Sequence, residues 1–133
     1  MKKPFKHKKI PIAPSEGWVK DEIKRILDHF GVWWFMPNGN HFGERGIPDF
    51  VCCYNGFFIG IEAKKEDGTW SKLQQQKAQE IKDNMGAYIV VDEWGIKSLH
   101  DYLLGCILGF SFGFFDFRGK TLNKEKEKVS ANT

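Results

Sequence analysis

Three side chains suited to phosphate chemistry flank a short hairpin signal: Asp49, Glu62 and Lys64. Asn55-Gly56 separates two runs rich in aromatic and β-branched residues, FVCCY and FFIGIEA, and this pattern predicts an antiparallel hairpin with a two-residue turn. Because side chains alternate along a strand, Glu62 and Lys64 share one face. The short turn also brings Asp49 beside Glu62. The sequence therefore predicts two carboxylates and an ammonium group at one end of a sheet.

This group of charges suits metal-assisted attack on a phosphate. Two hard oxygen ligands fit a magnesium ion that keeps several waters and also contacts a phosphate oxygen. A lysine beside them can orient or deprotonate the attacking water and offset charge on the phosphorane. The structural alternative is that Asp49 caps a turn while Glu62 and Lys64 form a solvated surface pair, since an acid two residues before a lysine is common on strands.

The residues around these three carry a family resemblance. They are Arg45-Gly46-Ile47-Pro48-Asp49, Gly56, Ile61-Glu62-Ala63-Lys64-Lys65, Gly68, Ser71, Gln74 and Gly86-Ala87. Through these residues, the stretch from Ser15 to Leu104 resembles the virus-type replication-repair nuclease (VRR-NUC) branch of the PD-(D/E)XK superfamily, in its phage form. The resemblance implies a restriction-endonuclease-like core and a Mg²⁺ or Mn²⁺ ion held by Asp49, Glu62 and the Ala63 carbonyl. It also implies a catalytic role for Lys64, with support from Gln74 and Glu16.

The first helix raises the question of which glutamate faces the site. Ser15 is a suitable N-cap and Gly31 a suitable end, and the apolar residues between them recur at helical spacing: Val19, Ile23, Ile26, Leu27 and Phe30. At about 100° per residue, Glu16 falls roughly 40° from the centre of this stripe and Glu22 roughly 80° away. Glu16 is thus predicted to face inward, and Glu22 is the alternative. Favourable charge at a helix N-terminus would also explain Glu16.

Gln74 has two explanations. Ser71-Lys72-Leu73-Gln74 fits a capping box, in which the glutamine bonds back to the N-cap. Gln74 also falls within the predicted inner face of this helix, formed by Leu73, Ala78, Ile81 and Met85, where a polar group needs a partner. The resemblance implies a glutamine close to the metal and so favours a role in the site. Gln75 and Gln76 are predicted to point elsewhere.

Candidate DNA contacts lie in loops and at the chain ends. The glycine-rich loop 37–48 offers Arg45, Asn40 and His41 to a substrate phosphate. His41 also suggests another class of nuclease, but no partner asparagine and histidine follow at suitable spacing, which favours an ordinary loop position. Further basic candidates are Lys65, Lys72, Lys6, Lys8 and Lys9.

Length and charge indicate one domain with basic ends. At 133 residues the chain can bury one core but not two. Residues 1–14 carry five lysines and no acid, and residues 118–133 carry five basic and two acidic side chains. We expect a disordered basic arm and a disordered charged tail, which in a nucleic-acid-binding protein also neutralise phosphates. The body, 15–117, holds ten Lys and Arg against fifteen Asp and Glu.

The cysteines and the apolar runs indicate an intracellular protein. Cys52, Cys53 and Cys106 form no CxxC pair, and adjacent Cys52 and Cys53 should face opposite sides of a strand. We interpret all three as small core residues in a reducing compartment. No apolar signal region follows the basic start, and the longest apolar run, 103–115, is too short to span a bilayer. We expect a cytoplasmic location, inside the host cell if the protein is phage-encoded, with no membrane partner and no organic cofactor.

The remaining elements complete an α/β pattern. Residues 32–36 and 87–91 read as buried strands and residues 94–104 as a helix with Ile96, Leu99, Leu103 and Tyr102 inward. The apolar extension 105–117 lies beyond this core and predicts an added strand or hairpin. It packs either on its own sheet or, since the core motifs are complete without it, against a second copy in a homodimer.

The sequence thus predicts an α/β domain with a mixed central sheet flanked by helices, acting as a metal-dependent endodeoxyribonuclease. Two alternatives share its active site: a structure-specific enzyme that resolves Holliday junctions or cuts flaps, and a sequence-specific homing or restriction endonuclease. A third, of another class, is an inactive DNA-binding module. No recognition helix, finger or repeat predicts which DNA is preferred.

Overall fold

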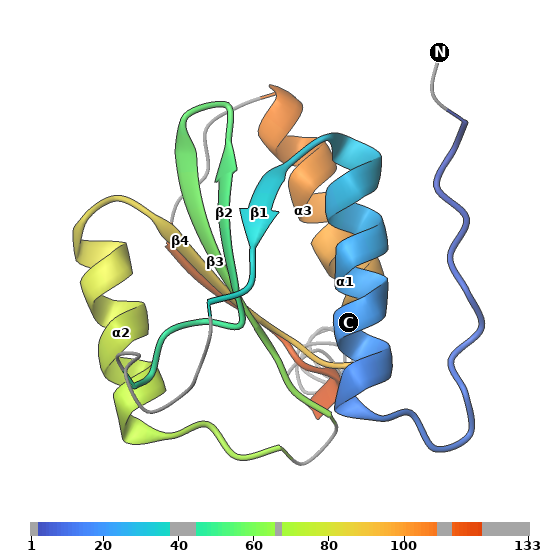
Figure 1. The fold of residues 1–133 in the computed structure, drawn as a ribbon, viewed down its shortest axis with the longest axis horizontal. Helices are drawn as coiled ribbons and strands as arrows, with labels where there is room; N and C mark the ends of the chain where they lie inside the picture. The colour runs from blue at the N-terminus through green and yellow to red at the C-terminus, as the bar shows by residue number, and fades with distance from the viewer. Residues whose placement is uncertain (1–2, 38–44, 66–67, 109–112, 121–133) are drawn as a thin grey trace, which may run out of the picture.

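The chain forms a five-stranded mixed sheet with helices on both faces (Figure 1). The computed structural model describes residues 3–37, 45–65, 68–108 and 113–120. Its helices are α1 (Glu16–Phe30), α2 (Lys72–Asp83) and α3 (Ile96–Leu108), and its strands are β1 (Trp33–Phe35), β2 (Phe50–Tyr54), β3 (Phe57–Ala63), β4 (Ala87–Val91) and β5 (Gly113–Phe117). The strands lie in sequence order, β1 to β3 antiparallel and β3 to β5 parallel. The predicted α/β class and mixed central sheet are confirmed.

The β2–β3 hairpin forms as predicted. Asn55 and Gly56 both have positive φ, 54° and 80°, which a two-residue turn of this kind requires. The register pairs Tyr54 with Phe57 and Phe50 with Ile61. Asp49 comes directly before β2. It therefore lies beside the last two residues of β3, Glu62 and Ala63.

Strand alternation divides the sheet between two cores. On β4, Ala87, Ile89 and Val91 belong to the larger core, which also contains the apolar stripe of α1, whereas Tyr88 and Val90 pack on the other face with Ala78 of α2. On β3, Ile59, Ile61 and Ala63 belong to the larger core. Glu62 alternates with them and therefore faces the same side as α2.

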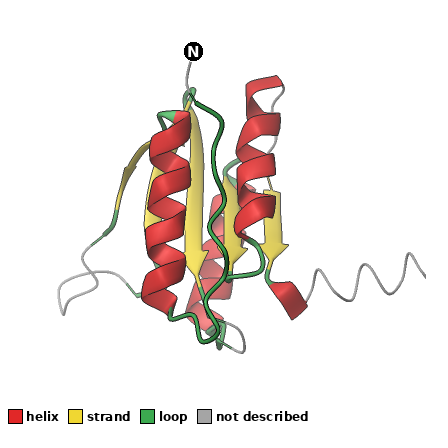
Figure 2. Ribbon diagram, turned by 90° about the vertical axis from the view of Figure 1, so that its right-hand side faces the viewer, coloured by secondary structure: helices red, strands yellow, loops and turns green. Residues whose placement is uncertain are grey.

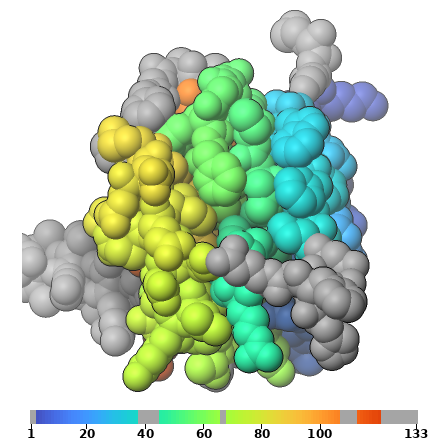
Figure 3. Space-filling model, turned by 60° about the vertical axis from the view of Figure 1, so that its left-hand side comes forward, coloured from blue at the N-terminus to red at the C-terminus, as the bar shows by residue number. Residues whose placement is uncertain are grey.

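The first strand is an edge strand, and the prediction that residues 32–36 are buried is wrong. Only Val32 is buried, whereas Trp33 and Phe35 are 62% and 45% exposed. Figure 3 shows β1 (cyan) and the hairpin (green) at the surface beside α2 (yellow). An apolar run predicts a buried strand. Which strand lies at the edge of the sheet is decided by the strand order, and the apolar run does not contain that information.

The apolar extension belongs to the fold of its own chain. Residues 105–108 continue α3, and β5 pairs in parallel with β4. Phe115 and Phe117 pack on the larger core. The sheet therefore continues beyond Leu104, the predicted end of the core, to Phe117. This apolar surface does not need a second chain for burial, and the homodimer stays a prediction.

The end of β5 contacts the turn that begins α3 so closely that only glycine fits at residue 95. A Cβ on Gly95 would lie 1.6 Å from the carbonyl oxygen of Phe117. Asp92, 2% exposed, accepts hydrogen bonds from the Gly119 amide at 2.8 and 3.0 Å and from the Trp94 amide at 2.9 Å. These contacts join β5 to the rest of the domain.

Gly95→Ala should therefore destabilise the protein by about 1–3 kcal/mol or more, as overpacking in a dense region does. Thermal unfolding followed by circular dichroism measures this change. Gly105→Ala is the matched control, because nothing lies within 4 Å of a Cβ there and alanine is favoured over glycine inside a helix by about 1 kcal/mol. Equal stability of the Gly95→Ala variant and the wild type would contradict the close packing of β5.

The basic arm is not a free segment over the residues that the structure describes. Residues 3–14 contain no helix or strand, but Phe5 packs on the larger core and contacts the rings of His29 of α1 and His100 of α3. Arg25 donates a hydrogen bond to the Lys6 carbonyl at 2.8 Å. Figure 2 shows the segment running along the outside of the helical layer. The prediction of a disordered arm missed this aromatic anchor.

The cysteines follow the predicted alternation. Cys52 is buried, Cys53 is exposed and Cys106 is half-buried, and all three are free thiols. The prediction that they are core residues is therefore correct for Cys52 and wrong for Cys53, which alternation along β2 turns outward. Burial raises the pKa of Cys52 to about 12, so this thiol is unreactive at neutral pH. In the part of the chain that the structure describes, no helix has the length and apolar character needed to cross a membrane.

Candidate active site

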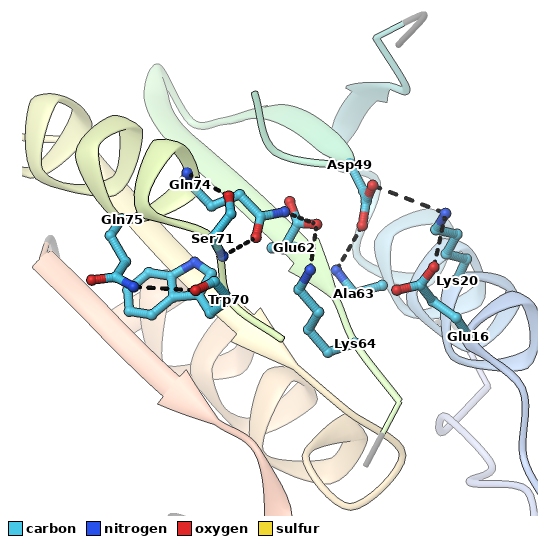
Figure 4. A network of polar contacts seen from close by, with 10 residues as sticks. All are labelled: Glu16, Lys20, Asp49, Glu62, Ala63, Lys64, Trp70, Ser71, Gln74 and Gln75. Carbon is cyan, nitrogen blue, oxygen red and sulfur yellow. Dashed lines mark hydrogen bonds and ion pairs between the residues drawn. The ribbon is translucent and has the colours of Figure 1, made fainter. Parts of the chain in front are cut away.

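Asp49, Glu62 and Lys64 meet at one end of β3, as the sequence predicts (Figure 4). The Ala63 amide donates a hydrogen bond to Asp49 Oδ2 at 2.9 Å, which holds the Asp49 carboxylate against the end of β3. Lys64 Nζ lies 3.7 Å from Glu62 Oε1, with 12% of the lysine side chain exposed. The backbone of Lys64 is fixed in turn by a bond from its amide to the Val91 carbonyl at 2.8 Å.

Gln74 forms the predicted capping box and also contacts Glu62. The Ser71 amide donates to Gln74 Oε1 at 3.0 Å and the Gln74 amide donates to Ser71 Oγ at 3.1 Å, which completes the capping box. The side-chain nitrogen of Gln74 then donates to Glu62 Oε1 at 2.9 Å. The cap of α2 thus aims a donor at the Glu62 carboxylate. Gln75 and Gln76 bond elsewhere, to the Trp70 carbonyl and to Glu80.

The predicted inner face of α2 is only partly correct. Ala78 is buried and Ile81 half-buried, but Leu73 and Met85 are 44% and 54% exposed. The loop before Asp49 approaches α2 closely. Gly46 has a positive φ of 83°, and a Cβ there would lie 2.7 Å from the Leu73 carbonyl oxygen. The loop contacts the backbone at Leu73 rather than covering its side chain.

Glu62 has an electrostatic environment that disfavours its charged form. The residue is 4% exposed. Burial, and after it the charge of Asp49, raises the pKa of Glu62 from 4.5 to about 8, although Lys64 opposes this shift. Its second oxygen, Oε2, is buried and accepts no hydrogen bond from any residue in the described ranges. A buried carboxylate oxygen without a donor needs a proton, a water or a cation.

These residues fit a hard divalent cation. Asp49 and Glu62 supply carboxylate oxygens of the kind that Mg²⁺ and Mn²⁺ prefer, and the unpartnered Glu62 Oε2 is an acceptor that such an ion would satisfy. Among the described residues no group of three or more His, Cys, Asp or Glu side chains is arranged to hold a metal ion. The predicted ligand set has only two such side chains, and its third ligand is the Ala63 carbonyl.

Lys20 is a site residue that the sequence reasoning missed. Its Nζ lies 3.9 Å from Asp49 Oδ1 and 3.7 Å from Glu16 Oε2, so it bridges the predicted first-helix glutamate and the predicted metal ligand. Glu16 itself is 45% exposed at its side chain and contributes to the margin of the site rather than its centre. The spacing of four residues between Glu16 and Lys20 was the available signal, because such residues share a helix face.

The predicted burial of the two glutamates of α1 is reversed. Glu22, the alternative, is 2% exposed, but it is paired with Arg25 and with Lys8 of the arm at 3.8 Å. It therefore serves the contact between α1 and the arm. Angular position on the helix suggested Glu16, but the first turn has solvent around it while the middle of α1 is covered by the arm.

The candidate DNA contacts have mixed outcomes. Arg45, Lys65 and Lys72 are exposed, as are Lys6, Lys8 and Lys9 of the arm. Asn40 and His41 lie outside the described residues. Lys64 and Lys65 also line a cavity of about 550 Å³ together with Glu16 and the residues around the start of α1. Neither Asp49 nor Glu62 lines this cavity, which is large enough for a nucleotide-sized group.

Comparison with known proteins gave no match to this chain from family models, curated proteins or solved structures.

Proposed function

We propose that this protein is a metal-dependent endodeoxyribonuclease that hydrolyses phosphodiester bonds with Mg²⁺ or Mn²⁺. The observation that carries the proposal is the buried Glu62 carboxylate, which has an unpartnered oxygen and lies beside a second carboxylate and a lysine. A buried carboxylate loses hydration and is repelled by a neighbouring acid, so the Glu62 charge destabilises the fold unless cations offset it. Such an arrangement is typical of a functional site.

The arrangement of elements supports the same proposal. From α1 to β4 the order is helix, three antiparallel strands, helix and a strand parallel to β3. We propose that this part of the α/β fold is the restriction-endonuclease-like core that the resemblance implies. In that core the site lies where Asp49, at the start of β2, meets the end of β3.

Each residue has a role that its contacts allow. Asp49, Glu62 and the Ala63 carbonyl would hold the ion, which when bound would polarise the phosphate and lower the pKa of a coordinated water. Lys64, close to Glu62, orients the attacking water and offsets the charge that develops on the phosphate. Gln74 fixes the orientation of Glu62, as residues behind metal ligands commonly do. Lys20 provides a second cation beside Asp49.

Incubation of the full chain with supercoiled plasmid tests the proposal against its rival of another class. A nuclease should nick or linearise the plasmid with Mg²⁺ or Mn²⁺ and not with EDTA, whereas an inactive DNA-binding module would only retard it. Ca²⁺ should support binding without cleavage. Parallel digestion of Holliday junctions, flaps, single strands and linear duplex then separates a junction-resolving or flap enzyme from a sequence-specific homing endonuclease.

A further prediction concerns the lysines of the arm. Replacing Lys6 and Lys9 with glutamine should make the dependence of log affinity on log salt shallower, by up to about 0.9 for each duplex phosphate that is no longer neutralised. Binding of labelled duplex in Ca²⁺ at several salt concentrations measures this slope. Substitution is preferable to deletion, because deletion would also remove Phe5 from the core. Lys24→Gln, which removes one equal charge from α1, is the control; an unchanged slope in the Lys6/Lys9 variant would assign binding to the region of Arg45.

A homodimer remains compatible with this function, since one site cuts one strand at a time. Light scattering on the full chain tests it. Truncation after Leu104 is not a suitable test, because it would remove β5 from the sheet.

A further inference from the structure

Three buried polar atoms gather on the α2 side of the sheet without a hydrogen-bond partner among the described residues. They are Glu62 Oε2, Trp70 Nε1 and the Tyr88 hydroxyl. Glu62 and Tyr88 come from the neighbouring strands β3 and β4, and the Trp70 and Tyr88 rings lie 6.3 Å apart. Each unpaired buried group destabilises the folded state, because it has given up its hydrogen bonds to water. Three in one place therefore require an explanation.

The three atoms have complementary hydrogen-bonding capacities. The indole N–H of Trp70 can only donate, a carboxylate oxygen of Glu62 can only accept, and the Tyr88 hydroxyl can do both. The structure as it stands forms no bond between them, but small side-chain rotations that close a chain in the order Trp70, Tyr88, Glu62 would satisfy all three. Burial, and after it the charge of Glu62, raises the pKa of Tyr88, so the phenol keeps the proton that it would donate.

The ring of Tyr88 is held in place by aromatic neighbours. Tyr88 is 0% exposed, and the rings of Trp70 and Phe114 stack at 5.1 Å with 10° between their planes. Phe114 also lies over Tyr88, and the Arg118 guanidinium lies 5.8 Å from the centre of the Trp70 ring. Phe114 of β5 and Arg118 thus pack against Trp70. Figure 4 shows Trp70 on the same side of Glu62 as Ser71 and Gln74.

We propose that Tyr88 is a positioning residue for Glu62, with its hydroxyl donating to Glu62 Oε2 and accepting from the Trp70 indole N–H. Gln74 holds one oxygen of the carboxylate and Tyr88 holds the other, so the orientation of Glu62 is fixed from two sides. A carboxylate oxygen has two lone pairs, so Oε2 accepts this bond and still contacts a cation. The effect on metal binding rests on the proposed function, whereas the contact itself does not.

Tyr88→Phe tests the inference because it removes the hydroxyl and keeps the stacked ring. The dissociation constant of the full chain for Mn²⁺, measured by electron paramagnetic resonance, should rise about 10- to 100-fold, as loss of a partner behind a metal ligand does. Tyr54→Phe, in the same sheet but next to the hairpin turn, is the matched control and should leave it unchanged.

A second measurement is made on the metal-free protein. In a nitrogen–proton NMR spectrum, Tyr88→Phe should shift the indole N–H resonance of Trp70, assigned through a Trp70→Phe variant. Carbon-labelled tyrosine should show that Glu62→Gln moves the Cζ resonance of Tyr88 and leaves those of Tyr54 and Tyr102 in place.

An unmoved Trp70 or Tyr88 resonance, or an Mn²⁺ dissociation constant within twofold of the wild type in Tyr88→Phe, would overturn the inference. If the wild-type chain binds no Mn²⁺, the proposed function fails, and the NMR shifts alone then decide whether Tyr88 positions Glu62.

Discussion

Lys64→Ala, Asp49→Asn and Glu62→Gln should each lower the rate of plasmid nicking by at least about two orders of magnitude. The first removes the ammonium beside the reacting phosphate, and the other two each remove an anionic oxygen ligand, so every loss acts on charge that develops in the transition state. Single-turnover cleavage with saturating Mg²⁺ measures the effect. Circular dichroism should show an intact fold, because each substitution keeps or reduces the volume of the side chain.

Gln74→Glu tests the contact behind Glu62 separately from Asp49, Glu62 and Lys64. A capping box accepts glutamate in place of glutamine, so the variant keeps the bond from the Ser71 amide but loses the donor to Glu62. Cleavage should fall by about 10- to 100-fold with α2 intact. Gln75→Glu, whose side chain faces the Trp70 carbonyl, should cleave at the wild-type rate.

Near-normal nicking by Asp49→Asn, Glu62→Gln or Lys64→Ala would remove that residue from the mechanism.

Local sequence rules were sufficient for the centre of the site. Two-residue periodicity and the Asn55-Gly56 turn were enough to predict that Asp49 meets Glu62, because a tight antiparallel hairpin leaves only one register. The capping box likewise placed Gln74 at the start of α2, within reach of β3. These contacts depend on residues that are close in sequence or joined by one turn.

Contacts between distant segments could not be predicted from the same rules. From the sequence alone, Tyr88 is one more apolar residue in the run AYIVV. The pairing of β4 with β3 sets it opposite Gly60, on the same face of the sheet as Glu62 and two residues away in register. Glu22 and Glu16 exchange their expected burial because the arm covers the middle of α1, and no helical angle contains that information. The choice between the extension's own sheet and a second copy could not be made from the sequence for the same reason: its place beside β4 is a property of the strand order, not of its composition.

The second large effect that we expect is on stability. Without a metal ion, Glu62→Gln should make the folded protein more stable than the wild type. Because the pKa of Glu62 is raised from 4.5 to about 8 in the folded protein, the folded state holds this proton more tightly than the unfolded chain. The stability of the wild type should therefore fall as pH rises from about 4.5 to about 8. Glu62→Gln has no such proton to lose, and it removes one of two adjacent negative charges.

In EDTA, the melting temperature of Glu62→Gln should exceed that of the wild type by a margin that grows between about pH 5 and pH 8, reaching on the order of a few kcal/mol in the free energy of unfolding. Mg²⁺ should reverse the order, since an ion that binds only the folded state stabilises the wild type. Glu22→Gln is the matched control: equally buried but paired with Arg25 and Lys8, it should lose stability with or without Mg²⁺. If Glu62→Gln is the less stable protein at pH 8 in EDTA, Lys64 compensates the Glu62 charge and no cation is needed there.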